Sequence, residues 1–242
     1  MKYLSRLFTI VLVAGVANSA SADIITAQYA VPAGYLLTSF QTNLPGPSGV
    51  GLQANQGAAL IQGLRTDVAG PGVDSSISSP FPSYCVEIGE GLSVAVLPSY
   101  GPAYTHTVTD LGGSVTSAGG ISGPVNFTAS LTDRLQLLWG TFQPTLSTNV
   151  DHAAFQVAVW KIAFDTNLNL FDNTSAMYYA APDAISLQAQ AYLTVVGTGV
   201  GPRQSLKLLS GANVQDLITV PAPGSAALLG LAGMVVARRR RA

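Results

Sequence analysis

One thiol stands out among the residues that could do chemistry. Cys85 is the only cysteine among 242 residues, so it cannot form a disulfide within the chain. It lies in the stretch SYCVEI, residues 83–88, whose alternation predicts a strand. Alternation places Tyr84 on the core face and Cys85 with Glu87 on the opposite, polar face. A lone cysteine is most simply a small buried hydrophobe, and this placement favours a thiol that meets a partner or needs a shield from oxidation.

A glutamine is the second candidate. Residues 151–165 predict a helix, and at about 100° per residue Gln156 falls between two apolar flanks of it. Lys161 and Asp165 lie on the opposite side, which we interpret as the wet face. A carboxamide within an apolar arc costs stability unless its polar atoms are paired. Gln156 must therefore meet something specific, either a structural hydrogen-bond partner or a reactive one.

Other chemically capable residues have weaker patterns. His152 precedes Gln156 by one turn and is either a base or an ordinary first-turn residue, while His106 lies in a Thr-rich strand and has a structural interpretation. Glu87 either positions an incoming amine or is solvated, and its charge would raise the thiol pKa. A hydrolase that uses Cys85 with a histidine lacks an orienting motif. With one cysteine and two histidines, we expect no cofactor and no conventional metal site.

The elements that must position these residues change character along the chain. Up to about residue 127, short apolar runs between Gly, Pro, Ser and Thr predict strands, among them 35–40, 93–97 and 104–109, and 56–64 is either helix or strand. Helices follow at 131–139, ended by Gly140, and at 151–165 and 183–196, the last two with Asp151 and Asp183 as N-caps. Segments 205–209 and 213–218 predict closing strands. We therefore expect an α+β fold: a β-rich sandwich or barrel-like body with three inserted helices, and long loops at 68–80 and 111–124.

Both ends of the chain have the character of sorting segments. Lys2 and Arg6 precede an apolar run and the small residues 20–22, which predicts a signal peptide at 1–22 and an exported domain at 23–219. Six of the eleven basic residues lie in the two ends and all twelve acidic residues lie between them. The domain thus has five basic residues and a net charge of about −7, which disfavours nucleic acid and anionic lipid as partners.

Residues 220–242 combine a proline-punctuated linker, a short apolar helix and a basic end. This tail resembles the PEP-CTERM sorting signal, with Pro221 and Pro223 at the motif and Arg238 and Arg239 opening the basic stop. The resemblance implies an exosortase-type processing enzyme and a membrane helix, at first anchoring the protein in the cell envelope. Ala222 stands where the family has glutamate, and this departure concerns cleavage rather than insertion.

The strand and helix motifs together resemble bacterial thioester domains. YCVEI on a strand, FQVAVWKIAFD on a helix and VQDLI near the end occur in that family's order, over residues 80–218. The resemblance implies an internal thioester between Cys85 and Gln156, and Trp160 matches the motif's tryptophan. Phe155 departs from the family, which has threonine before the glutamine. Tyr84 and Trp160 would shield the bond from water, and core packing is an equally good interpretation of Trp160.

The resemblance also implies a use. Thiol and carboxamide held together lose ammonia and leave a thioester, which an amine or hydroxyl on a protein or polysaccharide opens to attach itself to Gln156. Such a protein acts once and is not a turnover enzyme. Its place would be the cell surface or extracellular matrix. The same bond could be purely structural, or Cys85 could stay a free buried thiol in a non-covalent, exopolysaccharide-associated structural protein.

Overall fold

The computed structural model describes residues 23–44, 50–68, 70, 72–88, 92–111, 115–116, 124–212 and 214–222. The predictions for the signal peptide, for Pro223 and for Arg238 and Arg239 lie outside these ranges. β1 begins at Asp23, so cleavage after Ala22 would remove none of the described fold. At the other end Pro221 is half-buried, and the N–H of Ala222 donates to the carbonyl of Ser76. Among the described residues no helix is both long and apolar enough to cross a membrane.

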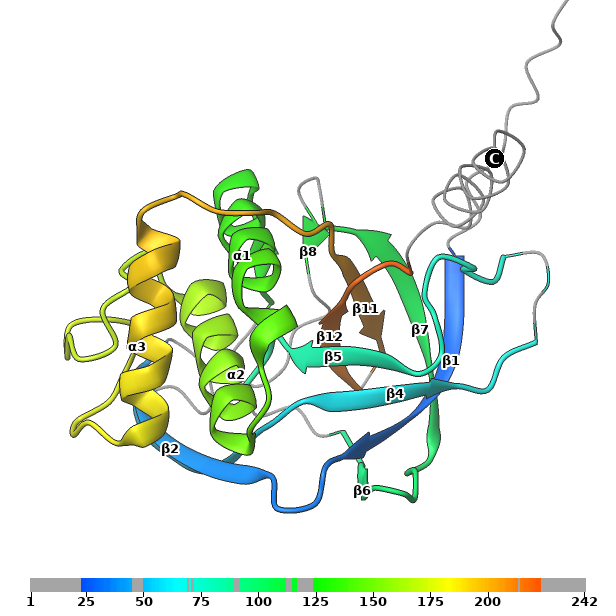
Figure 1. Ribbon diagram of the computed structural model, residues 1–242, viewed down its shortest axis with the longest axis horizontal. Helices are drawn as coiled ribbons and strands as arrows, with labels where there is room; N and C mark the ends of the chain where they lie inside the picture. The colour runs from blue at the N-terminus through cyan, green and yellow to red at the C-terminus, as the bar shows by residue number, and fades with distance from the viewer. Residues whose placement is uncertain are drawn as a thin grey trace, which may run out of the picture.

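Six antiparallel strands close into a barrel (Figure 1). They are β1 (Asp23–Val31), β4 (Ile61–Arg65), β5 (Phe81–Cys85), β7 (Ala103–Asp110), β11 (Lys207–Gly211) and β12 (Val214–Thr219). The order is β4, β5, β12, β11, β7 and β1, and β1 pairs with β4 to complete the ring. Short β6 (Ala95–Val96) adds in parallel to β1. Closure leaves the six strands without a free sheet edge over most of their length.

Period-two patterning explains the barrel wall. In β1 the side chains of Ile25, Ala27 and Tyr29 are buried while the residues between them are partly exposed, as expected for a strand with one core face. The Tyr29 ring meets the rings of Phe81 and His106 edge-on in the interior. β12 is buried at every residue and β5 at every residue except the half-buried Pro82, and α2 packs against β5.

A second, smaller sheet lies beside the barrel. It consists of β2 (Leu36–Asn43), β3 (Val50–Ala58) and β10 (Met177–Tyr178), in the order β10, β2, β3. The short strands β8 (Val115–Thr116) and β9 (Asn126–Phe127) pair separately. Residues 56–64, which were open to two interpretations, are the end of β3 and most of β4, joined by a short turn. Of the two expected long loops, 68–80 is largely described and most of 111–124 is not.

Three helices are inserted between β9 and β11, packed against one end of the barrel (Figure 1). They are α1 (Ala129–Phe142), followed by the short 3-10 turn Gln143–Thr145, α2 (Asn149–Phe164) and α3 (Ala184–Gly197). α2 is the central helix and contacts α1, α3, β2, β3 and β5. The predicted α+β architecture, a β-rich barrel with three inserted helices, is confirmed.

Two predicted helix boundaries are wrong. Gly140 does not end α1 but lies within it. A glycine is needed at this position because a Cβ would collide with the carbonyl of Pro202. Asp151 is not the N-cap of α2. The cap is Thr148, and Asp151 is the third helical residue, whose carboxylate completes a capping box by accepting from the Thr148 N–H. His152 is therefore in the fourth helical position. Asp183 is the N-cap of α3, as predicted.

The expected wet face of α2 does not exist. Lys161 is fully buried, and its ammonium donates to Asp165 at 2.8 Å and to the carbonyl of Met177 at 2.7 Å. Burial lowers the pKa of Lys161, and the Asp165 carboxylate opposes that shift. The prediction failed because the middle of α2 is enclosed on all sides. The two partners of Lys161 are Asp165, at the end of α2, and the carbonyl of Met177 on β10.

Candidate functional site

Cys85 and Gln156 meet through the backbone of β5. The N–H of Cys85 donates to Oε1 of Gln156 at 2.9 Å, and Nε2 of Gln156 donates to the Cys85 carbonyl at 2.8 Å. The predicted burial of Gln156 is confirmed, since its side chain is 0% exposed. The sequence also predicted that the Gln156 amide meets a specific partner, and in the structure this partner is the backbone of Cys85. Cys85 itself carries a free, buried thiol.

The pairing follows from where β4 begins. β4 pairs with β5 only up to the Ile61–Ser83 register, so the same edge of β5 has no strand beside Cys85. The other edge is occupied, because the N–H of Val86 donates to Asp216 on β12. N–H and C=O of alternate residues point to the same edge of a strand. The Gln156 amide, with one donor and one acceptor in line, therefore substitutes for a single residue of the missing strand.

Three residues of α2, each one turn apart, contact β5 and the residues just after it. His152 Nδ1 lies 2.7 Å from the Tyr84 hydroxyl, Gln156 pairs with Cys85, and the Trp160 indole N–H donates to the Glu87 carbonyl at 3.2 Å. Spacing of four residues places these side chains on one stripe of the helix. The stripe fixes the register of the helix against the strand.

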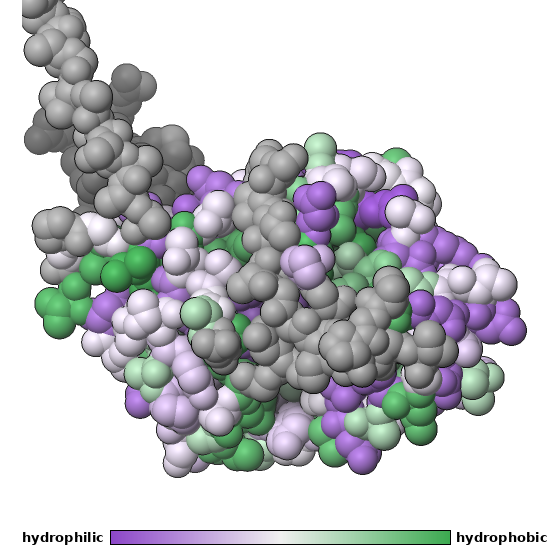
Figure 2. All heavy atoms as spheres, turned by 180° about the vertical axis from the view of Figure 1, so that it is seen from behind, coloured by the Kyte–Doolittle hydropathy of each residue, from purple (hydrophilic) through white to green (hydrophobic). Residues whose placement is uncertain are grey.

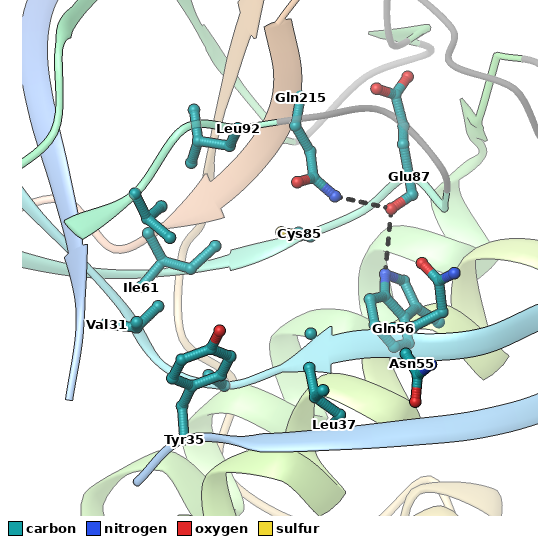
Figure 3. Close-up of a pocket in the computed structure, with 14 residues that line it drawn as sticks. Val31, Tyr35, Leu37, Asn55, Gln56, Ile61, Cys85, Glu87, Leu92 and Gln215 are labelled. Carbon is teal, nitrogen blue, oxygen red and sulfur yellow. Dashed lines mark hydrogen bonds between the residues drawn. The ribbon is translucent and has the colours of Figure 1, made fainter. Parts of the chain in front are cut away.

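A pocket of about 320 Å³ reaches Cys85 (Figure 3). Much of its described wall comes from the start of β2, the end of β3, the segment before β6, and β5 with its extension, and β1, β4 and β12 contribute one residue each. Trp160 closes one side, packed against Phe40 with ring centroids 5.7 Å apart. The pocket joins the buried thiol to the outside, and Trp160 serves both as core and as wall.

The Cys85 face of β5 is not the solvated face that alternation suggested. Cys85 is 3% exposed and Glu87 is 0% exposed, because the barrel and the segment after β5 enclose them. The Glu87 carboxylate accepts from the N–H of Asp216 at 3.3 Å and is turned away from Cys85 (Figure 3). Its carbonyl also accepts from Gln215 Nε2 at 2.9 Å. Glu87 is thus a buried residue that anchors Trp160 and Gln215 through its backbone, and the prediction of a solvated side chain is wrong.

Burial sets the protonation of the site. It raises the pKa of the Cys85 thiol far above its usual range, and the negative charge of Glu87 adds to this. The thiol is therefore neutral at physiological pH. Burial likewise lowers the pKa of His152, and the nearby Asp151 opposes the shift. A neutral thiol beside a neutral carboxamide is stable against adventitious oxidation, and it needs a proton transfer for any attack.

The two histidines are elsewhere. His152 is held by Tyr84, whose side chain lies on the helix side of β5, and His106 is buried inside the barrel against Tyr29. Neither is among the described residues that line the pocket at Cys85. No cluster of three or more His, Cys, Asp or Glu side chains suited to a metal occurs in the described part of the chain.

Sequence reasoning missed the outer part of the pocket. Tyr35, Leu37, Leu92 and Val94 line it, and they come from segments far apart in the chain. The sequence predicted only that 35–40 and 93–97, which contain Tyr35, Leu37 and Val94, form strands. Asn55 and Gln56 were not identified as site residues, and Gln215 was noted only as part of the VQDLI motif.

Comparison with known proteins gives two distant structural likenesses. No family profile matches the sequence, and no curated protein matches it. The fold is similar to the N-terminal thioester domain of a surface protein from Clostridium perfringens, with a TM-score of 0.42 and 10% identity over 80% of this chain and 97% of that one. It is also similar to a pilus-presented adhesin (Cpa), with a TM-score of 0.35 and 10% identity over 80% and 66% of the two chains. At this identity neither likeness assigns chemistry to this chain.

Proposed function

We propose that this is an exported surface protein that attaches covalently to a partner through a thioester between Cys85 and Gln156. The observation that carries the proposal is the double hydrogen bond that holds the Gln156 amide against Cys85 at 2.9 and 2.8 Å, at the end of a pocket. A glutamine that only filled the edge of β5 would not need a thiol as its neighbour or an opening beside it.

Bond formation would use the Cys85 thiol and the Gln156 carboxamide alone. The Cys85 sulfur attacks the carboxamide carbon of Gln156, the bond from that carbon to Nε2 breaks, and the thiol proton leaves with the nitrogen as ammonia. The N–H of Cys85 already donates to Oε1, so it can stabilise the negative charge that develops on this oxygen. Because burial keeps the thiol neutral, its proton must be transferred during the attack. Holding the two groups close together would compensate for the weak nucleophilicity of a neutral thiol.

Attachment reverses the sense of the reaction. An amine of the partner attacks the thioester carbon, the carbon–sulfur bond breaks, and the amine proton passes to the thiolate, leaving an amide at Gln156 and a free Cys85. The described lining of the pocket holds no histidine to activate a hydroxyl. An unassisted amine is a much better nucleophile toward a thioester than an alcohol, so the site favours amines.

Burial favours one alternative use of the same bond. Because Cys85 is 3% exposed, the thioester could instead be a sealed cross-link that closes a loop of 71 residues, adding about 4 kcal/mol if it acts like a disulfide of that span. Methylamine separates the two functions, since a sealed bond in the folded protein does not react with it and an attachment site does.

Export and anchoring remain part of the proposal. The signal peptide at 1–22 and the tail at 220–242, with its PEP-CTERM character, support secretion followed by exosortase-type sorting. The partner would then be a molecule of the cell surface or matrix.

The decisive experiment is the intact mass of the purified exported chain. We expect a mass one ammonia below that of the processed sequence, and no such deficit in Cys85→Ala or Gln156→Ala. Methylamine should restore the missing mass, with the added methyl group mapping to Gln156 and a new free thiol at Cys85. A wild-type mass equal to the sequence value would leave a non-covalent protein with a free buried thiol.

A further inference from the structure

The outer part of the pocket is apolar, although much of it faces water. Tyr35 is 39% exposed, Leu37 52% and Val94 37%, and the partly buried Leu92 lies among them. We call these four side chains the apolar collar. Figure 3 shows Tyr35 and Leu37 on the side of the pocket opposite β5, and Leu92 beyond Cys85. Exposed apolar side chains that gather at a reactive pocket indicate a contact surface rather than chance exposure.

Open space adjoins the collar on β3. Gly57 lies opposite Leu37 in the β2–β3 pairing, and a Cβ at Gly57 would meet no atom within 4 Å. The missing side chain leaves one flank of Leu37 uncovered. On the face seen in Figure 2, the described residues form separate apolar patches among polar ones.

Charge plays little part in the lining. Its described residues include no Lys, Arg or His, and the Glu87 carboxylate is turned away toward Asp216. The polar groups that remain are neutral amides, those of Asn55, Gln56 and Gln215, and the Tyr35 hydroxyl. A ligand with several charged groups would lose water here without gaining a charged partner, whereas apolar groups would gain by burial against the collar.

We propose that the apolar collar selects an amine carried by a protein segment whose neighbouring side chains are apolar, such as a lysine between leucines. This inference rests on the proposed covalent function and specifies its partner. The lysine chain enters the pocket of about 320 Å³ toward Cys85, while its neighbours cover Leu37 and Val94. An amino sugar of a polysaccharide is the opposing possibility.

The test compares rates of covalent addition to the wild-type chain, followed by intact mass. The probes are methylamine, an acetylated and amidated Leu-Lys-Leu peptide, the matching Gly-Lys-Gly peptide, and glucosamine. We expect the Leu-Lys-Leu peptide to react about tenfold faster than the Gly-Lys-Gly peptide, the size of effect that one apolar contact gives. Glucosamine should be slower than both peptides.

Variants of the collar locate the effect. Leu37→Ser and Val94→Ser should lower the rate with Leu-Lys-Leu to that with Gly-Lys-Gly and should lower the methylamine rate much less. Leu187→Ser on α3, which removes an equally exposed leucine (55%) away from the pocket, should change neither rate. Equal peptide rates in the wild type, or a collar variant that slows methylamine as much as the peptide, overturns the inference. Glucosamine reacting fastest would assign the site to polysaccharide, and a wild-type chain that reacts with no amine overturns the covalent function itself.

Discussion

The Gln156 side chain pairs with Cys85 at the edge of β5, where β4 would continue if it began two residues earlier. Its Oε1 accepts from the Cys85 N–H at 2.9 Å and its Nε2 donates to the Cys85 carbonyl at 2.8 Å. The arrangement satisfies two backbone groups that would otherwise be buried without partners. It also holds the carboxamide against the backbone of the only cysteine of the chain, so the contacts that stabilise the fold involve both residues of the proposed reaction.

The directionality of this pairing predicts the effect of Gln156→Glu. To exclude cross-linking, both sequences carry Cys85→Ala, which keeps the backbone groups. A carboxylate would place an oxygen where Nε2 now donates, so at pH 7 we expect a loss of about 3 kcal/mol in the free energy of unfolding. Burial raises the pKa of the introduced acid. The loss should therefore be small below the unfolded pKa of about 4.3 and grow as the pH rises.

Urea unfolding at pH 4 and pH 7 measures this loss. Gln204→Glu, at an exposed glutamine, is the matched control and should change stability little at either pH. A cost at position 156 that is equal at both pH values would contradict the assigned hydrogen bonds.

The contact between Tyr84 and His152 should control how fast the cross-link forms. The Tyr84 hydroxyl lies 2.7 Å from His152 Nδ1. Tyr84 precedes Cys85 by one residue on β5, and His152 precedes Gln156 by one turn on α2. Tyr84→Phe removes this contact and keeps the ring, so we expect ammonia loss about tenfold slower, because small displacements of reacting groups are costly. His152→Leu should do the same, and His152→Asn, which keeps a polar group near Nδ1, should restore much of the rate.

The rate is followed by intact mass after synthesis, at a temperature at which every variant is folded. Tyr29→Phe removes a buried hydroxyl inside the barrel, one for which the described structure gives no hydrogen-bond partner, and serves as control. If Tyr84→Phe matures as fast as Tyr29→Phe, the contact has a structural role only.

How much the sequence predicts depends on whether the partner is local. The alternation of β1, the Asp183 cap and the burial of Gln156 follow from patterns within one element, and each is correct. Gly140 resembled a helix stop, but its small size serves the approach of Pro202, which is distant in sequence. Lys161 resembled a surface residue, because the Met177 carbonyl, which accepts a hydrogen bond from its ammonium, belongs to another element.

The candidate site divides in the same way. Cys85 and Gln156 could be paired from motif order, but their contact runs through the backbone of Cys85 and depends on where β4 begins, which no periodicity shows. The apolar collar joins two segments that are far apart in the chain. Such convergence arises only when tertiary packing places loops and strand ends around one pocket.

Lys161 offers a test of the helix core. Lys161→Met leaves the Asp165 carboxylate and the Met177 carbonyl without their ammonium partner, and we expect a loss of about 3 kcal/mol in the free energy of unfolding at pH 7. Adding Asp165→Asn should recover part of the loss. Arg203→Met breaks the exposed pair with Asp133 and should cost less than about 1 kcal/mol. Urea unfolding measures the free energy of unfolding of each variant. Equal losses for Lys161→Met and Arg203→Met would contradict the burial of Lys161.

His106 predicts how the barrel responds to acid. Its ring is fully buried against Tyr29, and neither ring nitrogen has a hydrogen-bond partner in the described structure. Burial lowers the pKa of His106 from 6.5 to about 4. Below pH 6.5 His106 is therefore protonated in the unfolded chain, whereas in the folded chain it is protonated only near pH 4. The free energy of unfolding of the wild type falls across that window by at most about 3 kcal/mol. His106→Phe keeps the ring contact and removes the titration, so its stability relative to wild type should rise as the pH falls from 7 to 4. Urea unfolding at several pH values measures the difference between the two proteins, and a difference that does not change with pH would show that the pKa of His106 is the same in the folded and unfolded chains.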